Sequence, residues 1–233
     1  MEMELKELNE QLRQKPVVEQ LRTVSDFYRD KIVFTTSFGM EDQVLTDMIF
    51  KNDIPVKVVT LDTGRLFPET YKVFHDTITK YDKKIHVFFP ERDEVEEMVT
   101  KKGPFSFYDS KENRLECCHI RKVVPLDRAL DGMHFWISGI RSGQSFNRKN
   151  MSSLEWDEGR KLFKFYPLMD WSVEDVDLYI KENNIPSNTL YTKGFKSIGC
   201  APCTRAVRKG EDLRAGRWWW ENDSIKECGC HIK

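Results

Sequence analysis

The chain has 233 residues, of which 39% are hydrophobic and 32% charged, and its formal net charge is −1. These values are ordinary for a soluble globular domain, and no apolar run approaches the roughly 20 residues that a membrane-spanning helix needs. The balanced charge also gives no extended basic footprint for nucleic acid. The N-terminus lacks the apolar stretch of a secretory signal, so we expect a cytoplasmic protein without membrane contact.

Short apolar runs alternate with amphipathic segments through the first part of the chain. The runs at 31–36, 56–61, 85–89 and 134–138 predict buried strands. Segments 41–51 and 68–81 each gather apolar side chains on one helical face. This alternation is typical of an α/β fold with a mostly parallel, twisted sheet and helices on both faces, in which ligands bind beyond the carboxyl ends of the strands.

The pattern changes after residue 150. The sequence around Asp157 to Gly159 predicts a hairpin, and Ser172, followed by acidic residues, predicts the start of a helix. Beyond Pro186 the chain is rich in Gly, Lys and Arg, and it ends in a polar tail. We expect a single α/β domain over residues 1–216 and a mobile C-terminal catalytic tail over residues 217–233.

Polar loops follow three of the predicted strands. Ser37 and Gly39 open the first helix, where backbone amides and a serine hydroxyl can bind phosphate, although simple capping explains the same residues. Thr63 lies in a similar turn after the second strand, and Arg141 follows the fourth. Because no GK[ST] follows Gly39, the first loop is not a Walker motif. We expect the three loops to share one rim of the sheet.

Six cysteines occur in three pairs, and their spacing is not that of a disulfide framework. They are Cys117 and Cys118, Cys200 and Cys203, and Cys228 and Cys230. In a reducing cytosol such cysteines are more often metal ligands or redox catalysts than bridges. Adjacent side chains on a helix diverge by about 100 degrees, so the first pair would suit a cluster better than one ion. Zinc and plain burial remain alternatives.

Several motifs together resemble the assimilatory adenylyl-sulfate reductases. They are the Ser37 loop, LDTGRLFPET, CCHIRK, ISGIRSGQS, the CxxC followed by RAGRWWWE, and the terminal Glu-Cys-Gly-x-His. They extend from residue 37 to residue 231, nearly the whole chain. The resemblance implies the adenine nucleotide alpha-hydrolase-like fold, related to the ATP pyrophosphatases, which agrees with the α/β pattern.

The resemblance also implies a cofactor and a substrate. The family carries one [4Fe-4S] cluster on this arrangement, here Cys117, Cys118, Cys200 and Cys203, with 81 residues between Cys118 and Cys200. Related phosphoadenylyl-sulfate (PAPS) reductases generally lack these four cysteines. Their presence favours adenylyl sulfate (APS) as substrate, and a dual APS/PAPS reductase is the alternative.

By the same resemblance, Cys228 is the nucleophile that forms an S-sulfocysteine and releases AMP, and His231 belongs to its motif. A thioredoxin or glutaredoxin-like dithiol then releases sulfite, as in sulfate assimilation and cysteine biosynthesis. The cations expected at the phosphosulfate are Lys122, Arg141, Arg214 and Arg217. Cys230 departs from the family, which usually has leucine there. A homo-oligomer is also implied.

Two other functions remain open from the residues. An ATP pyrophosphatase-like enzyme would share the fold but would not need Cys228. A zinc-binding nucleic-acid module would use the basic segment 199–217, although a solvated basic face explains that segment more simply.

Overall fold

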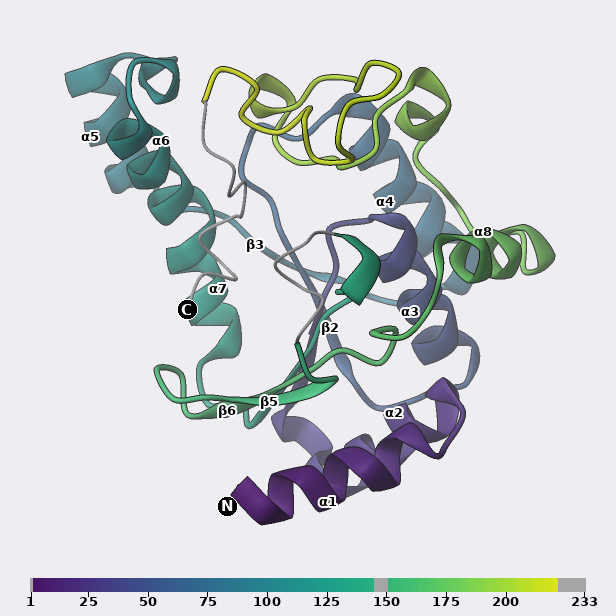
Figure 1. Ribbon diagram of the computed structural model, residues 1–233. Coiled ribbons are helices and arrows are strands. Elements are labelled where there is room, and N and C mark those ends of the chain that lie inside the picture. Colours follow the sequence, from purple (N-terminus) through teal and green to yellow (C-terminus); the bar gives the residue numbers. More distant parts are fainter. Residues whose placement is uncertain (1, 145–150, 222–233) are drawn as a thin grey trace. The chain divides into compact units, whose positions relative to one another are not determined.

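The computed structural model describes residues 2–144 and 151–221, with side chains from residue 7 onward (Figure 1). The α-helices are α1 (Glu2–Arg13), α2 (Val17–Tyr28), α3 (Met40–Lys51), α4 (Pro68–Tyr81), α5 (Arg92–Lys102), α6 (Lys111–Cys118), α7 (Val124–Leu130) and α8 (Val173–Glu182). The strands are β1 (Ile32–Thr35), β2 (Lys57–Leu61), β3 (His86–Phe88), β4 (Phe135–Ile137), β5 (Leu154–Asp157) and β6 (Leu162–Phe165). No helix in these ranges has the length and apolar character needed to cross a membrane.

The strands form one six-stranded sheet in the order β3-β2-β1-β4-β6-β5. The pairs β1–β2, β1–β4 and β4–β6 are parallel, and the β5–β6 pair is antiparallel. The predicted α/β class is therefore confirmed, and so are the four predicted strands and the hairpin. The order reverses at β1, so the loops after β1 and β4 leave neighbouring strands, where α/β proteins place their ligands.

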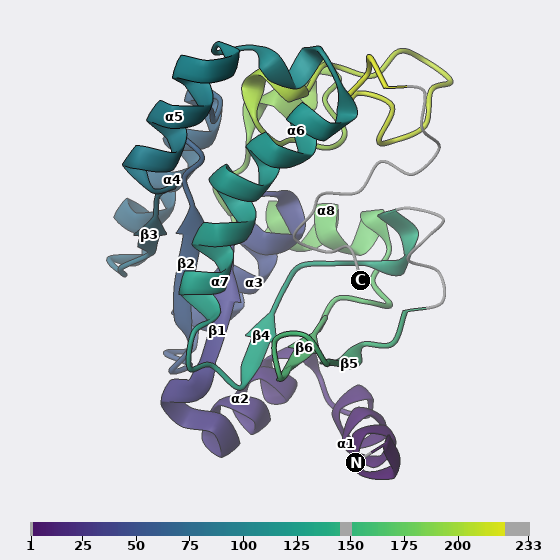
Figure 2. The ribbon, with the colours of Figure 1, turned by 90° about the vertical axis from the view of Figure 1, so that its left-hand side faces the viewer.

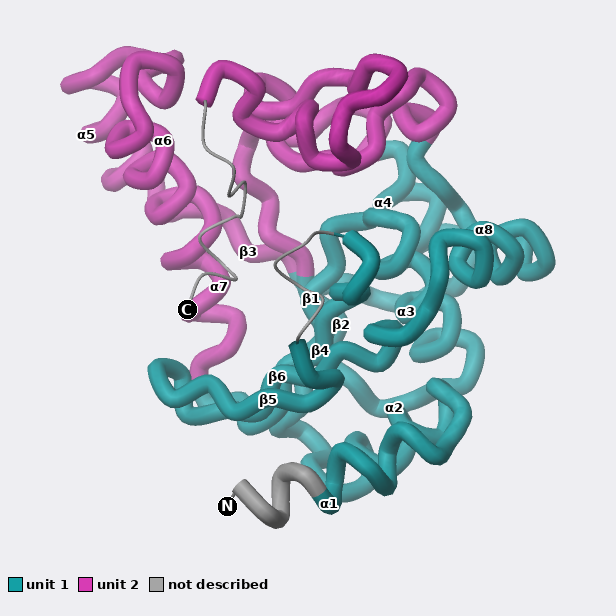
Figure 3. The backbone as a smooth tube through the Cα atoms, in the orientation of Figure 1, with its two compact units in different colours: residues 1–59, 72–86, 132–188 teal, residues 60–71, 87–131, 189–233 magenta. Residues whose placement is uncertain are grey.

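By its contacts the chain divides into two compact units, each of which is discontinuous in sequence (Figure 3). Unit 1 comprises residues 1–59, 72–86 and 132–188. Unit 2 comprises residues 60–71, 87–131 and 189–233. The predicted boundary between residues 216 and 217 stays a prediction.

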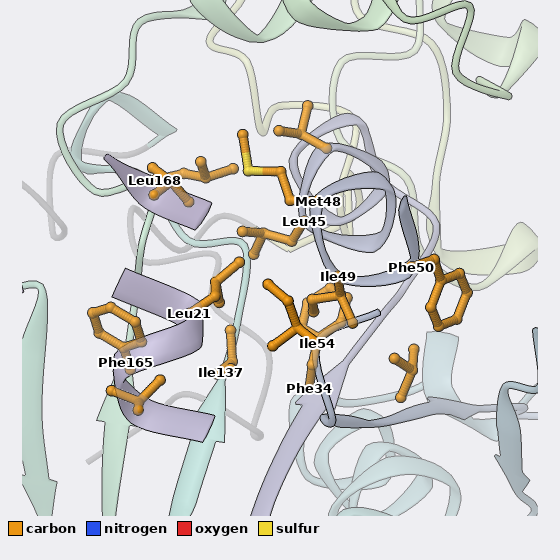
Figure 4. Packing of buried hydrophobic residues seen from close by; sticks show 14 of the residues in the cluster. Leu21, Phe34, Leu45, Met48, Ile49, Phe50, Ile54, Ile137, Phe165 and Leu168 are labelled. Atoms are coloured by element: carbon orange, nitrogen blue, oxygen red, sulfur yellow. The ribbon is translucent and has the colours of Figure 1, made fainter. Parts of the chain in front are cut away.

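The main core lies in unit 1, where helices pack on one face of the central strands (Figure 4). Ile32 and Phe34 of β1 alternate with Val33, which points to the opposite face of the sheet. All three are fully buried, so both faces of this strand are covered, as expected for a parallel sheet. Helix-borne residues that complete the core include Leu21 of α2, Leu45 and Ile49 of α3, and Val176 and Ile180 of α8.

Helix α8 begins where the sequence predicts. The Ser172 hydroxyl accepts from the Asp175 backbone N–H at 3.0 Å, and the Asp175 carboxylate accepts from the Ser172 backbone N–H at 2.8 Å. This reciprocal capping box satisfies two N–H groups that the first turn leaves without helical partners.

A single helical run from α6 to α7 crosses unit 2 (Figure 2). It is interrupted by a π-helical turn over His119–Val123. Pro125 explains the interruption, because in a regular α-helix its ring would clash with the carbonyl of Arg121, four residues earlier. The wider π turn relieves that clash, and such turns are frequent at functional sites.

Helices α3, α4 and α8 of unit 1 meet at the carboxylate of Asp47, which is 1% exposed. It accepts hydrogen bonds from the Tyr81 hydroxyl at 2.6 Å and the Tyr179 hydroxyl at 3.0 Å. Burial and the neighbouring carboxylate raise the pKa of both tyrosines, which therefore stay protonated donors.

We expect Tyr81→Phe to destabilise the protein by about 1 to 3 kcal/mol, because the buried Asp47 carboxylate would lose one of its two donors. Urea unfolding measures this change. The matched control is Tyr28→Phe. The centroid of the Tyr28 ring lies 4.7 Å from that of Phe135, and the Tyr28 hydroxyl has no hydrogen bond assigned among the described residues. Equal losses in the two variants would contradict this role of Asp47.

Candidate active site

Four of the six cysteines line one cavity, which lies within unit 2. Cys117 and Cys118 are the last two residues of α6. Cys200 immediately precedes the short turn at Ala201–Cys203, and Cys203 is its last residue. Each is 8% exposed, and the four form no disulfide with one another. The space that they line measures about 300 Å³ and is partly open to solvent. Its other lining residues are Arg65, Phe107, Arg114, Arg121 and Lys122.

The loop after β2 contacts the CxxC turn through Thr63 and Arg65. The Arg65 carbonyl accepts from the Ala201 backbone N–H at 2.8 Å. The Thr63 hydroxyl lies 3.3 Å from the Cys200 sulfur and accepts from the Arg65 backbone N–H at 3.2 Å. Thr63 is predicted to line the nucleotide pocket. Its side chain contacts the Cys200 sulfur, and the residue is only 1% exposed.

Aromatic rings and apolar side chains enclose the cysteines. The Tyr108 hydroxyl donates to the Pro202 carbonyl at 2.6 Å and fixes the CxxC turn from the other side. The buried cluster around the sulfurs also contains Met98, Phe107 and Trp218. An apolar shell of this kind limits water access and lowers the local dielectric constant, which strengthens every charge interaction inside it.

Two arginines that are not among the predicted site residues, Arg114 and Arg121, line the same cavity. Arg114 and Arg121 lie three or four residues from Cys117 and Cys118, so they share a helical face with them. The Arg121 Nη1 donates to the Thr63 carbonyl at 2.7 Å. This three- and four-residue spacing of basic residues around an adjacent cysteine pair is the signal that could have identified them from sequence.

Burial and the nearby arginines act on the cavity thiols in opposite directions. Burial raises the pKa of the Cys117 thiol, while the Arg121 and Arg65 guanidinium groups oppose the rise. Burial and the neighbouring Cys200 and Cys118 sulfurs raise the pKa of Cys203 to about 12. Thiolates at these positions therefore need a cationic group among them as well as the surrounding arginines.

Several buried hydrogen-bond donors around the cavity lack an acceptor among the described residues. The Nη1 atom of Arg114 and the Nε atom of Arg121 are buried and have no hydrogen-bond partner among the described residues. The Nε atom of Arg217 and the indole nitrogen of Trp220 are in the same condition. Buried donors of this kind cost free energy unless an acceptor is present, and the sulfurs of a metal cluster are such acceptors.

The four cysteines fit a cluster better than a single ion. Within residues 2–144 and 151–221, no three His, Cys, Asp or Glu side chains converge on a position suitable for one metal ion. The sulfurs nevertheless line a common cavity, and Cys117 and Cys118 come from adjacent helical positions. An object with several metal atoms can meet ligands that do not converge on one point.

The predicted phosphate loop after β1 lies in unit 1. Its Ser37 hydroxyl and backbone N–H both donate to the Asp42 carboxylate, at 2.6 and 2.7 Å. Gly39 is the N-cap of α3. Burial raises the pKa of Asp42 to about 6, although hydrogen bonds from Ser37 and from the Gly139 backbone oppose the rise. The same carboxylate thus joins the loops that follow β1 and β4.

Arg141 is held by the first turn of α3. Its guanidinium forms a buried ion pair with Glu41 at 2.8 Å and donates to the Trp171 carbonyl at 3.2 Å. A substrate phosphate at this rim would meet an arginine that is already oriented by a carboxylate.

The other predicted residues of the substrate site lie in unit 2 or outside the described ranges. Lys122 lines the cysteine cavity. Arg217 is 6% exposed, and its guanidinium lies 4.7 Å from the Trp218 ring. The Arg214 backbone N–H donates to Asp212 at 2.8 Å. Cys228 and His231 lie outside the described residues, as does Cys230.

Gly139 is the position where the strand-end loops of unit 1 have least space. A Cβ atom there would collide with the Asp42 carboxylate and lie 3.1 Å from its backbone nitrogen. We expect Gly139→Ala to destabilise the protein by about 2 kcal/mol in urea unfolding, because the overpacked loop must shift.

The matched control for Gly139→Ala is Gly143→Ala in the same segment. A Cβ atom at residue 143 would make only an ordinary contact, 3.6 Å from the Arg141 Nη1 atom. We expect this variant to stay within about 0.5 kcal/mol of the parent. Equal stability of the two variants would show that the Asp42 contact is not restrictive.

Comparison with known proteins agrees with these observations. The family model for the phosphoadenosine phosphosulfate reductase domain matches residues 31–206. An adenosine 5'-phosphosulfate reductase of Agrobacterium fabrum is 49% identical over 202 residues, which cover 87% of this chain and 78% of that protein. A protein of the same name from Sinorhizobium fredii strain USDA 257 is 44% identical over 232 residues, covering 100% of this chain and 92% of that protein.

Solved structures confirm the predicted fold class. A phosphoadenylyl-sulfate reductase from Candida auris, in a phosphate complex, superposes with a TM-score of 0.74 at 28% identity, covering 87% of this chain and 96% of that one. An FMN adenylyltransferase from Candida glabrata shares the fold alone, with a TM-score of 0.54 at 15% identity over 96% of this chain and 77% of that one. The chain belongs to the phosphoadenosine phosphosulfate reductase family.

Proposed function

We propose that this chain is an oxidoreductase that converts adenylyl sulfate into sulfite and AMP, within assimilatory sulfate reduction. Membership of the family and relatives named adenosine 5'-phosphosulfate reductase support this reaction. The observation that carries the choice of adenylyl sulfate is the cavity lined by Cys117, Cys118, Cys200 and Cys203. By the resemblance, these cysteines mark the enzymes that act on the nucleotide without a 3′-phosphate.

The four cysteines would hold one [4Fe-4S] cluster. The buried donors of Arg114 and Arg121 would then have acceptors, and the cations that line the cavity would offset the charge of the thiolates. When bound, the cluster supplies a fixed, buried charge beside Lys122. It need not carry electrons, because a dithiol reductant delivers both.

The first chemical step belongs to Cys228. Its thiolate attacks the sulfur of the sulfate group, the bond from that sulfur to the bridging phosphate oxygen breaks, and AMP leaves with both electrons of that bond. The product on the enzyme is an S-sulfocysteine. Lys122, Arg141, Arg214 and Arg217 would neutralise the charge that builds on the departing phosphate. His231 would assist Cys228 as part of the same motif.

The second step needs a protein dithiol of the thioredoxin or glutaredoxin type. One of its thiolates attacks the Cys228 sulfur, sulfite leaves, and a mixed disulfide forms. The second thiol of the partner then attacks that disulfide, so Cys228 returns as a thiolate and the partner leaves oxidised. The two electrons gained by the sulfate sulfur thus come from the partner's two thiols.

The nucleotide would bind along the strand-end loops. Ser37, Gly39 and Thr63 are the proposed lining residues, and the hydrogen bonds from Ser37 to Asp42 hold the first loop in place. Because the matched family model and the Candida auris structure are named for the 3′-phosphorylated substrate, a dual APS/PAPS reductase is the second candidate. A cytoplasmic homo-oligomer completes the proposal.

The experiment that tests the reaction follows the mass of the intact protein after addition of adenylyl sulfate without any reductant. We expect one added SO₃ group on Cys228 and release of one AMP per site, because the first step needs no electrons. Thioredoxin added afterwards should remove the group as sulfite.

The matched variants are Cys228→Ser and Cys230→Ser, which lie two residues apart in the same tail. We expect Cys228→Ser to form no adduct and Cys230→Ser to form it at the parental rate. An adduct on Cys228→Ser, or thioredoxin-dependent sulfite release by that variant, would rule out the proposed nucleophile.

A further inference from the structure

Glu221, the last described residue before the C-terminal segment, is anchored in unit 2. Its two carboxylate oxygens accept from the Nε and Nη2 atoms of Arg114, at 2.7 and 2.9 Å. The Glu221 backbone N–H also donates to the Trp218 carbonyl at 2.9 Å. The side chains of the ion pair are only 5% and 9% exposed, so this bidentate pair is shielded from water.

The other side of Arg114 faces the cysteines. Arg114 lines their cavity, and it precedes Cys118 by one helical turn. Its guanidinium carbon lies 4.8 Å from the Trp218 ring, which fixes the plane of the group. One guanidinium therefore lies beside the cavity cysteines and also holds Glu221, where the described part of the chain ends.

We propose that the Arg114–Glu221 pair is a positioning link that couples cluster binding at Cys118 to the root of the tail that carries Cys228. This inference rests on the proposed function for the roles of the cluster and of Cys228. Cys228 lies seven positions after Glu221 in the chain, so a fixed root keeps Cys228 within about 25 Å of this point. If Glu221 is released from Arg114, Cys228 can occupy a larger volume.

The coupling follows from the cost of leaving charges unpaired. Removal of one partner of a buried ion pair is strongly destabilising, because the remaining charge stays desolvated. The Nη1 atom of Arg114 has no hydrogen-bond partner among the described residues. An anionic cluster bound by Cys118 would give the Arg114 Nη1 atom an acceptor. The Nε and Nη2 atoms would then stay bound to the Glu221 carboxylate. Loss of the cluster would weaken both contacts together.

A second Arg–Glu pair in unit 2 provides the matched control. Arg205 and Glu211 form a bidentate pair of similar geometry, with distances of 2.7 and 3.0 Å. Neither residue lines the cysteine cavity, and their side chains are 32% and 27% exposed. Glu211→Gln therefore removes the same charge and the same kind of ion pair at a place that does not line the cysteine cavity.

The test measures how fast trypsin cuts the tail after Lys226, in parent, Glu221→Gln and Glu211→Gln proteins. Each protein is prepared anaerobically with its cluster retained, and again after iron is removed by a chelator. Iron content and visible absorption report the cluster, and cleavage elsewhere in the chain reports general unfolding. Because cleavage of a locally opened segment follows the population of the open form, we expect cluster removal to speed the Lys226 cut about tenfold in the parent.

Glu211→Gln should show the same dependence on the cluster as the parent. Glu221→Gln should retain iron and be cut at the faster rate whether or not the cluster is present. Equal rates for the loaded and cluster-free parent would overturn the proposal, and that comparison decides the question even if Glu221→Gln does not fold. A Glu221→Gln protein that behaves like the parent would also overturn it.

The assay uses neither substrate nor reductant. It can therefore fail while the proposed reaction holds, or succeed while that reaction fails. A single-turnover measurement then connects the link to chemistry, with Glu221→Gln expected to form the Cys228 adduct about tenfold more slowly at saturating adenylyl sulfate, as expected for a lost orienting contact.

Discussion

Burial of four sulfurs in one cavity is the constraint on which the rest of unit 2 depends. Two of them sit on adjacent helical positions, and the other two lie at a short turn that begins after 81 intervening residues. Arg121 in the π turn donates to the Thr63 carbonyl, and the Thr63 hydroxyl contacts the Cys200 sulfur, so the loop at Thr63 joins these two segments. The Tyr108 hydroxyl also donates to the Pro202 carbonyl in the CxxC turn. The apolar shell around the sulfurs makes the arrangement stable only if their charge is compensated.

That compensation explains why so many arginines are buried at this place. Arg114 and Arg121 share a helical face with the adjacent cysteines and keep nitrogen atoms that lack an acceptor among the described residues. A fully paired set of arginines and carboxylates would need no further anion. Unpaired donors beside four thiols instead indicate a site that is completed by a group with hydrogen-bond acceptors, such as the sulfurs of a metal cluster. The pair of Arg114 with Glu221 extends this charge network to the start of the tail.

Much of the fold could be predicted from sequence because local signals agree with the tertiary structure. The four apolar runs became β1 to β4, the hairpin formed at Asp157, and Ser172 capped α8 as expected. The cysteine set was also evident from spacing. The hydrophobic periodicity does not predict the π turn, but Pro125 indicates that a regular α-helix is interrupted near this position. Contacts such as Arg114 with Glu221, or the Thr63 hydroxyl with Cys200, join residues 107 and 137 positions apart, and no local pattern encodes them.

The central claim is that the four cysteines hold one iron–sulfur cluster, and analysis of iron, acid-labile sulfide and zinc in the anaerobically purified chain tests it most directly. The account predicts iron and sulfide in equal amounts, about four of each per chain, with visible absorption typical of a cubane cluster. One tightly bound zinc per chain, with no sulfide and no colour, would contradict it.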